Sequence, residues 1–200
     1  SLVRLKNSKQ DGKAKILLYA YGAYKHSISP SFSASRFCLV DRGITFGIAH
    51  VRGGGDVSDA WHTEGKKKLK KNTFLDYIAC AIHLIEQRYT YRGGVCFYGG
   101  SAGGLTGGAV ANMAPDLFFS MLLLVPFVDT MTTMLNEKLP LTPAEWELWG
   151  NPIKSKEYFD YILSYSPYDN LVKKKYPPML ITSSIFDNRV LYSEPVKYIA

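Results

Sequence analysis

The strongest chemical signal in the sequence is a serine among glycines, in the stretch GGSAGG from Gly99 to Gly104. The apolar run VCFYG precedes it and LTGGAVANMA follows, so Ser101 lies between a predicted strand and a predicted helix. The pattern G-x-S-x-G in that position is typical of a nucleophile elbow, a strained turn that presents the serine hydroxyl and tolerates only small neighbours. We predict Ser101 as a nucleophile and the N–H of Ala102 as an oxyanion donor. A glycine-rich turn that only packs a helix on a strand is the alternative.

The sequence disfavours phosphate binding, metal binding and nucleic-acid binding. A phosphate-binding loop needs Lys after the last glycine, where this chain has Leu105, and Gly53 to Gly55 do not give G-x-G-x-x-G either. The three cysteines and four histidines have no metal-ligand spacing, so we expect neither a metal nor another cofactor. Lysine runs at 66–71 and 173–175 supply much of the net charge of +7. They lack interleaved aromatic residues, so we interpret them as solvated faces and expect no nucleic-acid partner.

The elements that must position Ser101 alternate between strands and helices. Apolar runs predict five buried strands, at residues 16–21, 44–51, 95–99, 120–125 and 179–184. A helix is predicted from a capping box of Thr73 and Asp76, with an apolar face of Phe74, Ile78, Ile82 and Ile85. This alternation predicts an α/β fold with a doubly wound, mostly parallel sheet.

Composition is that of one globular domain over residues 1–200, with 46% hydrophobic and 20% charged residues. The segment around PLTP (140–143) reads as a long insertion and not as a domain break. No apolar run approaches the roughly 20 residues that span a bilayer, so we expect no membrane association. The polar amino terminus shows no signal-peptide pattern, which favours a cytoplasmic location.

Several ordered motifs together resemble the catalytic domain of the prolyl oligopeptidase family of serine peptidases, and most of all its oligopeptidase B (protease II) branch. They run from residue 16 almost to the end of the chain. The motifs are LLYAYGAY (17–24), VRGGGD (51–56), KKNTFLDYIA (70–79), GGSAGG, VPFVDTMTTML (125–135), WGNP (149–152), YSPYDN (165–170) and YPPMLITSS (176–184).

The resemblance implies an α/β-hydrolase fold with a Ser-Asp-His triad in that chain order. It assigns Ser101 as nucleophile and Asp187, in the turn FDNRV after the last predicted strand, as the acid. It also implies that Tyr21 completes the oxyanion hole and that Arg189 holds a substrate carbonyl. Two other aspartates, Asp129 and Asp169, are expected to be structural.

The same resemblance places substrate recognition in TPAEWELWG, residues 142–150, where prolyl-specific members carry a tryptophan and the oligopeptidase B branch carries glutamates. Glu145 and Glu147 occupy those places, which implies short basic peptides cleaved after Arg or Lys. Trp146 leaves proline stacking open as an alternative. Ser29 and Ser31 stand where many relatives have two aspartates, so a dibasic preference is not implied.

The resemblance implies that the catalytic base, a histidine, follows Asp187 in the chain. Residues 188–200 contain no histidine, and all four histidines precede Ser101. Substitution by His50 or His62 stays open as a minor alternative. The resemblance therefore implies a fragment without the family's N-terminal β-propeller, truncated before the last elements of the fold and inactive alone. An inert remnant or binding domain of the same fold is one alternative. A lipase or carboxylesterase is another, although YAYG replaces the usual HGGG loop.

Overall fold

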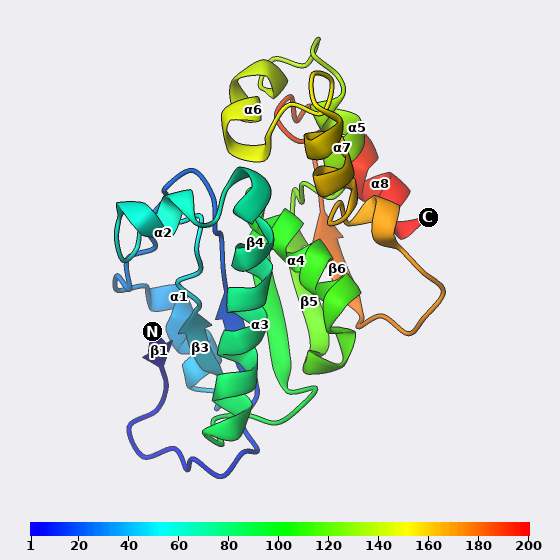
Figure 1. Ribbon diagram of the computed structural model, residues 1–200. Coiled ribbons are helices and arrows are strands. Elements are labelled where there is room, and N and C mark those ends of the chain that lie inside the picture. The colour runs from blue at the N-terminus through cyan, green and yellow to red at the C-terminus, as the bar shows by residue number, and fades with distance from the viewer.

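The computed structural model describes residues 1–200 and contains a six-stranded, mostly parallel sheet (Figure 1). The strand order is β1-β3-β2-β4-β5-β6, and only β1 runs antiparallel to its neighbour. The strands are β1 (Leu2–Val3), β2 (Ile16–Tyr19), β3 (Thr45–Ile48), β4 (Val95–Gly100), β5 (Phe118–Leu124) and β6 (Met179–Thr182). All five predicted strands are therefore present. The two-residue β1 has no apolar run long enough to predict it.

The last strand differs from expectation in its surroundings. The run 179–184 was predicted to be buried, but β6 lies at the edge of the sheet and alternates between half-buried and exposed residues. Leu180 is 61% exposed. An apolar run indicates a strand, but its burial depends on which elements cover it in three dimensions.

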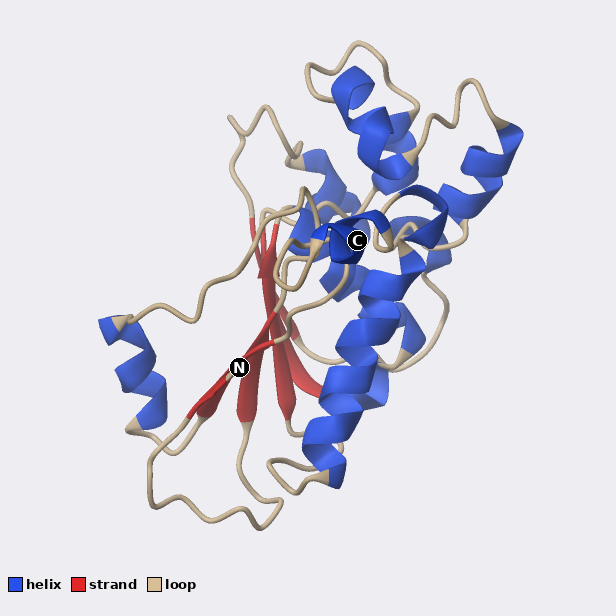
Figure 2. Cartoon of the chain, turned by 60° about the vertical axis from the view of Figure 1, so that its left-hand side comes forward, coloured by secondary structure: helices blue, strands red, loops and turns tan.

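Helices cover both faces of the sheet, as a doubly wound fold requires. The helix α1 (Ala34–Val40) lies on one side, and α3 (Lys71–Glu86) and α4 (Ala102–Met113) lie on the other (Figure 2). Right-handed crossovers explain this arrangement, because the chain moves from β2 to β3 in one direction and then from β3 to β4 and β5 in the other. The reversal leaves a crevice at the carboxyl ends of β2 and β4.

The start and the buried face of α3 differ from the prediction. Thr73 lies within the first turn and donates its hydroxyl to the carbonyl oxygen of Arg52 at 2.7 Å. The carboxylate of Asp76 accepts hydrogen bonds from the backbone and guanidinium of the same arginine. The predicted capping box is therefore wrong, because a tertiary contact uses both side chains. The helix buries Phe74, Tyr77, Ala81 and Leu84 and leaves Ile82 37% exposed.

The lysine run at 66–71 is also not a uniformly solvated face. Lys70 is fully buried at 0% exposure, while Leu69 in the same run is exposed. The backbone enters α3 at this point from the short 3-10 helix η1 (Lys67–Leu69), which follows α2 (Asp59–Thr63). The direction of that entry, which the local sequence pattern does not encode, decides which lysine turns inward.

The insertion between β5 and β6 packs on the same core as the sheet. Thirty buried residues form a single hydrophobic cluster, to which the insertion contributes Trp149, Ile162 and Tyr165. The insertion lies beyond the carboxyl ends of the strands, at the top of Figure 1. The remaining helices are η2 (Pro115–Leu117), α5 (Thr130–Met134), α6 (Thr142–Trp149), α7 (Lys156–Leu163), η3 (Tyr168–Asn170) and α8 (Ser193–Ile199). Not one of the helices combines the length and the apolar character needed to cross a membrane.

Candidate active site

Ser101 occupies the sharp turn between β4 and α4 with φ 53° and ψ −121°. A positive φ is unfavourable for a residue with a Cβ, so neighbouring contacts must hold this conformation. The N–H of Ser101 donates to the carbonyl oxygen of Leu124 at 2.9 Å, and its own carbonyl oxygen accepts from the N–H of Phe127 at 3.1 Å. The end of β5 and the segment after it therefore fix the strained turn.

The glycines around Ser101 are required by close backbone contacts. A Cβ on Gly100 would lie 2.9 Å from the carbonyl oxygen of Leu124, and one on Gly103 would lie 2.7 Å from that of Ala20. A Cβ on Gly104 would come within 2.4 Å of Pro126. The steric reason that the sequence suggested for the small residues thus holds in the structure.

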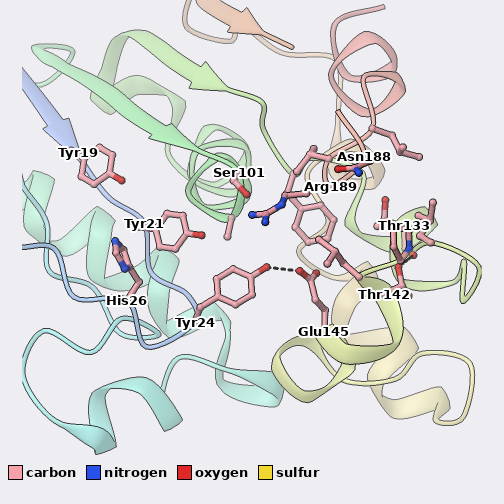
Figure 3. Close-up of a pocket in the computed structure, with 17 residues that line it drawn as sticks. Tyr19, Tyr21, Tyr24, His26, Ser101, Thr133, Thr142, Glu145, Asn188 and Arg189 are labelled. Atoms are coloured by element: carbon pink, nitrogen blue, oxygen red, sulfur yellow. Dashed lines mark hydrogen bonds between the residues drawn. The ribbon is translucent and has the colours of Figure 1, made fainter. Parts of the chain in front are cut away.

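A cavity of about 560 Å³ opens beside Ser101 (Figure 3). Five separate parts of the chain line it: the loop after β2, the elbow, the segment after β5, the insertion and the turn after β6. The hydroxyl of Tyr21 and the guanidinium of Arg189 point toward the elbow from different sides (Figure 3). The predicted site residues on the cavity wall are Tyr21, Ser101, Ala102, Glu145 and Arg189.

Tyr21 and Ala102 supply hydrogen-bond donors at this wall. Ala102 is the first residue of α4, so its N–H has no carbonyl one turn earlier to bind. Burial raises the pKa of Tyr21, and the charge of Glu145 adds to the rise, while Ser101 and Arg189 oppose it. The Tyr21 hydroxyl therefore keeps its proton at neutral pH and can donate it in a hydrogen bond.

Glu145 is the carboxylate on the cavity wall, and both of its oxygens are engaged. Oε1 accepts from the Tyr24 hydroxyl at 2.8 Å, and Oε2 accepts from Nε1 of Trp149 at 3.1 Å. Burial, followed by the charge of Glu145, raises the pKa of Tyr24, so that hydroxyl remains a donor. Two neutral donors thus hold a negative charge at one end of the cavity.

Glu147 is not brought together with Glu145. Its side chain is 84% exposed and forms an ion pair with Lys67 at 3.0 Å. The pKa of Glu147 is lowered by that lysine. Two positions along α6 rotate a side chain by about 200° around the helix axis, so the two glutamates face different surroundings.

Asp187 lies in the turn after β6 and is half-buried. Its Oδ1 accepts from the N–H groups of Arg189 at 2.8 Å and Val190 at 3.0 Å, which shape the turn that carries Arg189 to the cavity. Asp187 itself is not on the cavity wall.

The two aspartates expected to be structural make contacts away from the cavity. Asp129 is buried and forms an ion pair with Lys197 of α8. Asp169 accepts a hydrogen bond from the hydroxyl of Ser166 at 2.6 Å.

None of the four histidines forms a hydrogen bond with Ser101. The ring of His50 bonds to Ser1 and Asp56, and Nδ1 of His62 lies 3.0 Å from the carbonyl oxygen of Gly53. Neither His50 nor His62 is on the cavity wall, whereas His26 is. The His26 ring packs edge-on against Tyr21, with ring centroids 5.4 Å apart, and Tyr21 separates it from Ser101 (Figure 3).

Sequence reasoning missed Tyr24, His26 and Trp149. Trp149 follows Glu145 by four positions, which is one helical turn, so the spacing could have indicated a contact. Tyr24 and Glu145 come from distant segments, and no local pattern could pair them.

Comparison with protein families gives a match to the prolyl oligopeptidase family over residues 30–200. Among curated proteins, the chain is 48% identical over its whole length to dipeptidyl aminopeptidase BI from Pseudoxanthomonas mexicana, covering 28% of that protein. It is 49% identical over 198 residues to protease 2 from Moraxella lacunata, covering 99% of this chain and 29% of that one. The chain thus spans less than a third of the length of these relatives.

The comparison with solved structures finds similar proteins. Oligopeptidase B from Leishmania major superposes with a TM-score of 0.95 at 45% identity, over 99% of this chain and 28% of that one. Oligopeptidase B from Trypanosoma brucei, solved with covalently bound antipain, gives a TM-score of 0.95 at 46% identity, over 98% of this chain and 28% of that one. The likeness confirms the predicted α/β-hydrolase fold.

Proposed function

The chain belongs to the prolyl oligopeptidase family and is similar to oligopeptidase B, and we propose that it carries the active site of a serine peptidase that cleaves short peptides after Arg or Lys. One observation carries this proposal. A serine on a strained turn shares a cavity with a tyrosine hydroxyl, a guanidinium and a held carboxylate, although these groups come from four parts of the sequence.

The proposed reaction begins with attack of the Ser101 Oγ on the carbonyl carbon of the substrate. As that bond forms, the hydroxyl proton passes to a histidine, which returns it to the leaving amine when the peptide bond breaks. Water then hydrolyses the acyl-serine. We propose that the histidine comes from a segment outside residues 1–200, in keeping with the greater length of the relatives, and that Asp187 orients it.

The developing negative charge on the substrate oxygen requires donors that are already in place. The N–H of Ala102 and the hydroxyl of Tyr21 are proposed to fill this role, and both lie on the wall beside Ser101. Arg189 is proposed to hold a second substrate carbonyl from the opposite side of the cavity.

Selectivity for a basic side chain is proposed to come from Glu145. The Tyr24 hydroxyl and Trp149 Nε1 hold its carboxylate at the wall without neutralising its charge. An arginine guanidinium can form charge-assisted hydrogen bonds to such a carboxylate, and a lysine ammonium can make a single contact. A contribution from Glu147 would require it to leave Lys67.

The test is a chimaera in which residues 1–200 replace the matching region of Moraxella lacunata protease 2. We expect it to hydrolyse peptide amides in the order Arg, then Lys, far ahead of Pro, and to lose this activity with Ser101→Ala. Blocked amino termini should be tolerated, because we propose cleavage of internal bonds. A preference for Pro would transfer specificity to Trp146, and a preference for simple esters would favour an esterase. A folded chimaera that hydrolyses neither would favour an inert domain.

A further inference from the structure

Lys70 is a buried cation that the proposed mechanism leaves without a role. Its side chain is fully buried, no carboxylate lies within 4.0 Å of it, and burial alone lowers its pKa to about 7. Burying an unpaired ammonium is unfavourable, so the contacts it makes in return are informative.

The ammonium of Lys70 holds the loop that carries Tyr21. Nζ donates to the carbonyl oxygen of Gly22 at 2.5 Å and to Oγ1 of Thr73 at 3.0 Å. Gly22 directly follows Tyr21 and has φ +78°. A Cβ on Gly53 would lie 2.2 Å from the same carbonyl oxygen, so that oxygen is confined between Gly53 and the ammonium.

The same ammonium also contacts the residue that holds the cavity carboxylate. Nζ lies 5.2 Å from the centroid of the Trp149 ring, a cation–π distance, and Trp149 Nε1 donates to Glu145. The titratable groups around Lys70 are Tyr24 from the loop, His62 from α2 and Lys66 before η1, with Glu145 on the far side of the tryptophan. Tyr24, His62 and Lys66 cannot supply a carboxylate. The partners of the positive charge are therefore the Gly22 carbonyl, the Thr73 hydroxyl and the rings of Trp149 and Phe74, and of the two rings Trp149 lies nearer, at 5.2 Å against 5.8 Å.

We propose that Lys70 is a positioning residue whose ammonium locks the Tyr21 loop through the Gly22 carbonyl and the Trp149 ring, and so aligns the Tyr21 hydroxyl with Ser101. Loss of the proton weakens both contacts, because a charge-assisted hydrogen bond and a cation–π contact each need the positive charge. The loop is therefore held most firmly at the acidic side of neutral pH. For its kinetic consequence this inference rests on the proposed peptidase function.

The kinetic test uses Lys70→Met in the chimaera, with Lys71→Met as the matched control, because the Lys71 ammonium packs on Tyr161 and not on the loop. Lys70→Met should lower kcat roughly 10- to 100-fold, as expected for a misplaced catalytic group, and should remove a fall in kcat/KM as pH rises through about 7. In a Tyr21→Phe background, Lys70→Met should add little. Equal losses in both backgrounds, or a loss with Lys71→Met of the same size, would overturn the proposal.

Stability separates positioning from a merely structural role. The variant Lys70→Met replaces a buried charge that has no carboxylate partner by an apolar side chain of similar length. At pH 6, residues 1–200 with this substitution should therefore unfold at a denaturant concentration equal to or higher than that of the parent chain. The parent chain should become more stable from about pH 7 to 10.5, since the unfolded state holds the extra proton there, and Lys70→Met should remove this rise. Parallel losses of stability and activity would contradict the proposal.

A spectroscopic readout is independent of activity. In residues 1–200 labelled with ¹³C-tyrosine, the Tyr21 signal, assigned by Tyr21→Phe, should shift as pH rises through about 7. The comparison is made in a His26→Gln background, because the His26 ring packs edge-on against Tyr21 and could change the Tyr21 signal independently of Lys70. The shift should vanish with Lys70→Met. If it occurs while the chimaera is inactive, the proposed function fails and the positioning role stands; if the chimaera is active and the signal does not shift, the positioning role is wrong.

Discussion

The hydroxyl of Tyr24 donates a 2.8 Å hydrogen bond to Oε1 of Glu145, across 121 positions of sequence. The bond joins the loop after β2, which carries Tyr21, to α6 of the insertion, which carries the cavity carboxylate. Trp149 holds the other carboxylate oxygen and packs edge-on against Tyr24, with ring centroids 6.0 Å apart. The two parts of the cavity wall that carry Tyr21 and Glu145 are therefore joined by one connected set of side chains.

Residues 1–200 alone should show no measurable turnover of peptide amides. Without a histidine bonded to it, the Ser101 hydroxyl stays unactivated, and loss of one triad member can lower kcat on the order of 10⁶-fold. The measurement is amide hydrolysis by the purified chain beside the protease 2 chimaera. Robust turnover that Ser101→Ala abolishes would mean that a histidine within this chain serves as the base.

Tyr21→Phe in the chimaera should lower kcat for a peptide amide by roughly 10²-fold, or about 3 kcal/mol, because one oxyanion donor is removed. Thermal stability should hardly change. Tyr98→Phe is the control, since Tyr98 lies on β4 and does not line the cavity. An unchanged kcat/KM for Tyr21→Phe would show that this tyrosine is only packing.

Glu145→Gln should lower kcat/KM for substrates with Arg before the cleaved bond by roughly 10- to 1000-fold, because the guanidinium loses its charged partner in a partly buried site. Substrates with Pro at that position should be little affected. Glu147→Gln serves as a matched control on the same helix, and its effect should be small because Glu147 is exposed and paired with Lys67. Comparable losses in the two variants would contradict the assignment of selectivity to Glu145.

Glu194 should make the stability of residues 1–200 depend on pH. Burial raises the pKa of this α8 carboxyl to about 7, above the ordinary value of 4.5, although it accepts hydrogen bonds from Thr133 and the Asp129 N–H. Between those two pH values the folded state binds more protons than the unfolded state, so stability should be greatest below the ordinary value and fall as pH rises toward 7.

The Glu194 carboxyl can lower the free energy of unfolding by at most roughly 1.4 kcal/mol for each unit that the pH rises. Glu194→Gln should flatten this fall in urea unfolding curves measured from pH 4.5 to 7.5. Glu137→Gln, at an exposed carboxyl, should leave the slope as it is in the parent chain. Identical slopes in the parent chain and Glu194→Gln would contradict the prediction.

The sequence by itself determined the features that depend on neighbouring residues. Five strands were predictable because each is a short apolar run within the local sequence, although the burial of β6 was not. The elbow was predictable because the serine and its glycines occupy neighbouring positions. The fold class followed from the order of those elements. The family motifs placed Tyr21, Glu145 and Arg189, which line one cavity with Ser101.

Only the tertiary structure decided which member of a similar pair faces inward. Glu145 lines the cavity and Glu147 does not, because α6 docks with one side toward the loop after β2. Thr73 and Asp76 have the spacing of a capping box, but Arg52 engages both. Lys70 is buried within a run of lysines because η1 turns into α3 at that residue. In each case the outcome depends on contacts between segments that are distant in sequence. The free energy of these contacts outweighs the local conformational preference, and no short stretch of sequence contains both partners.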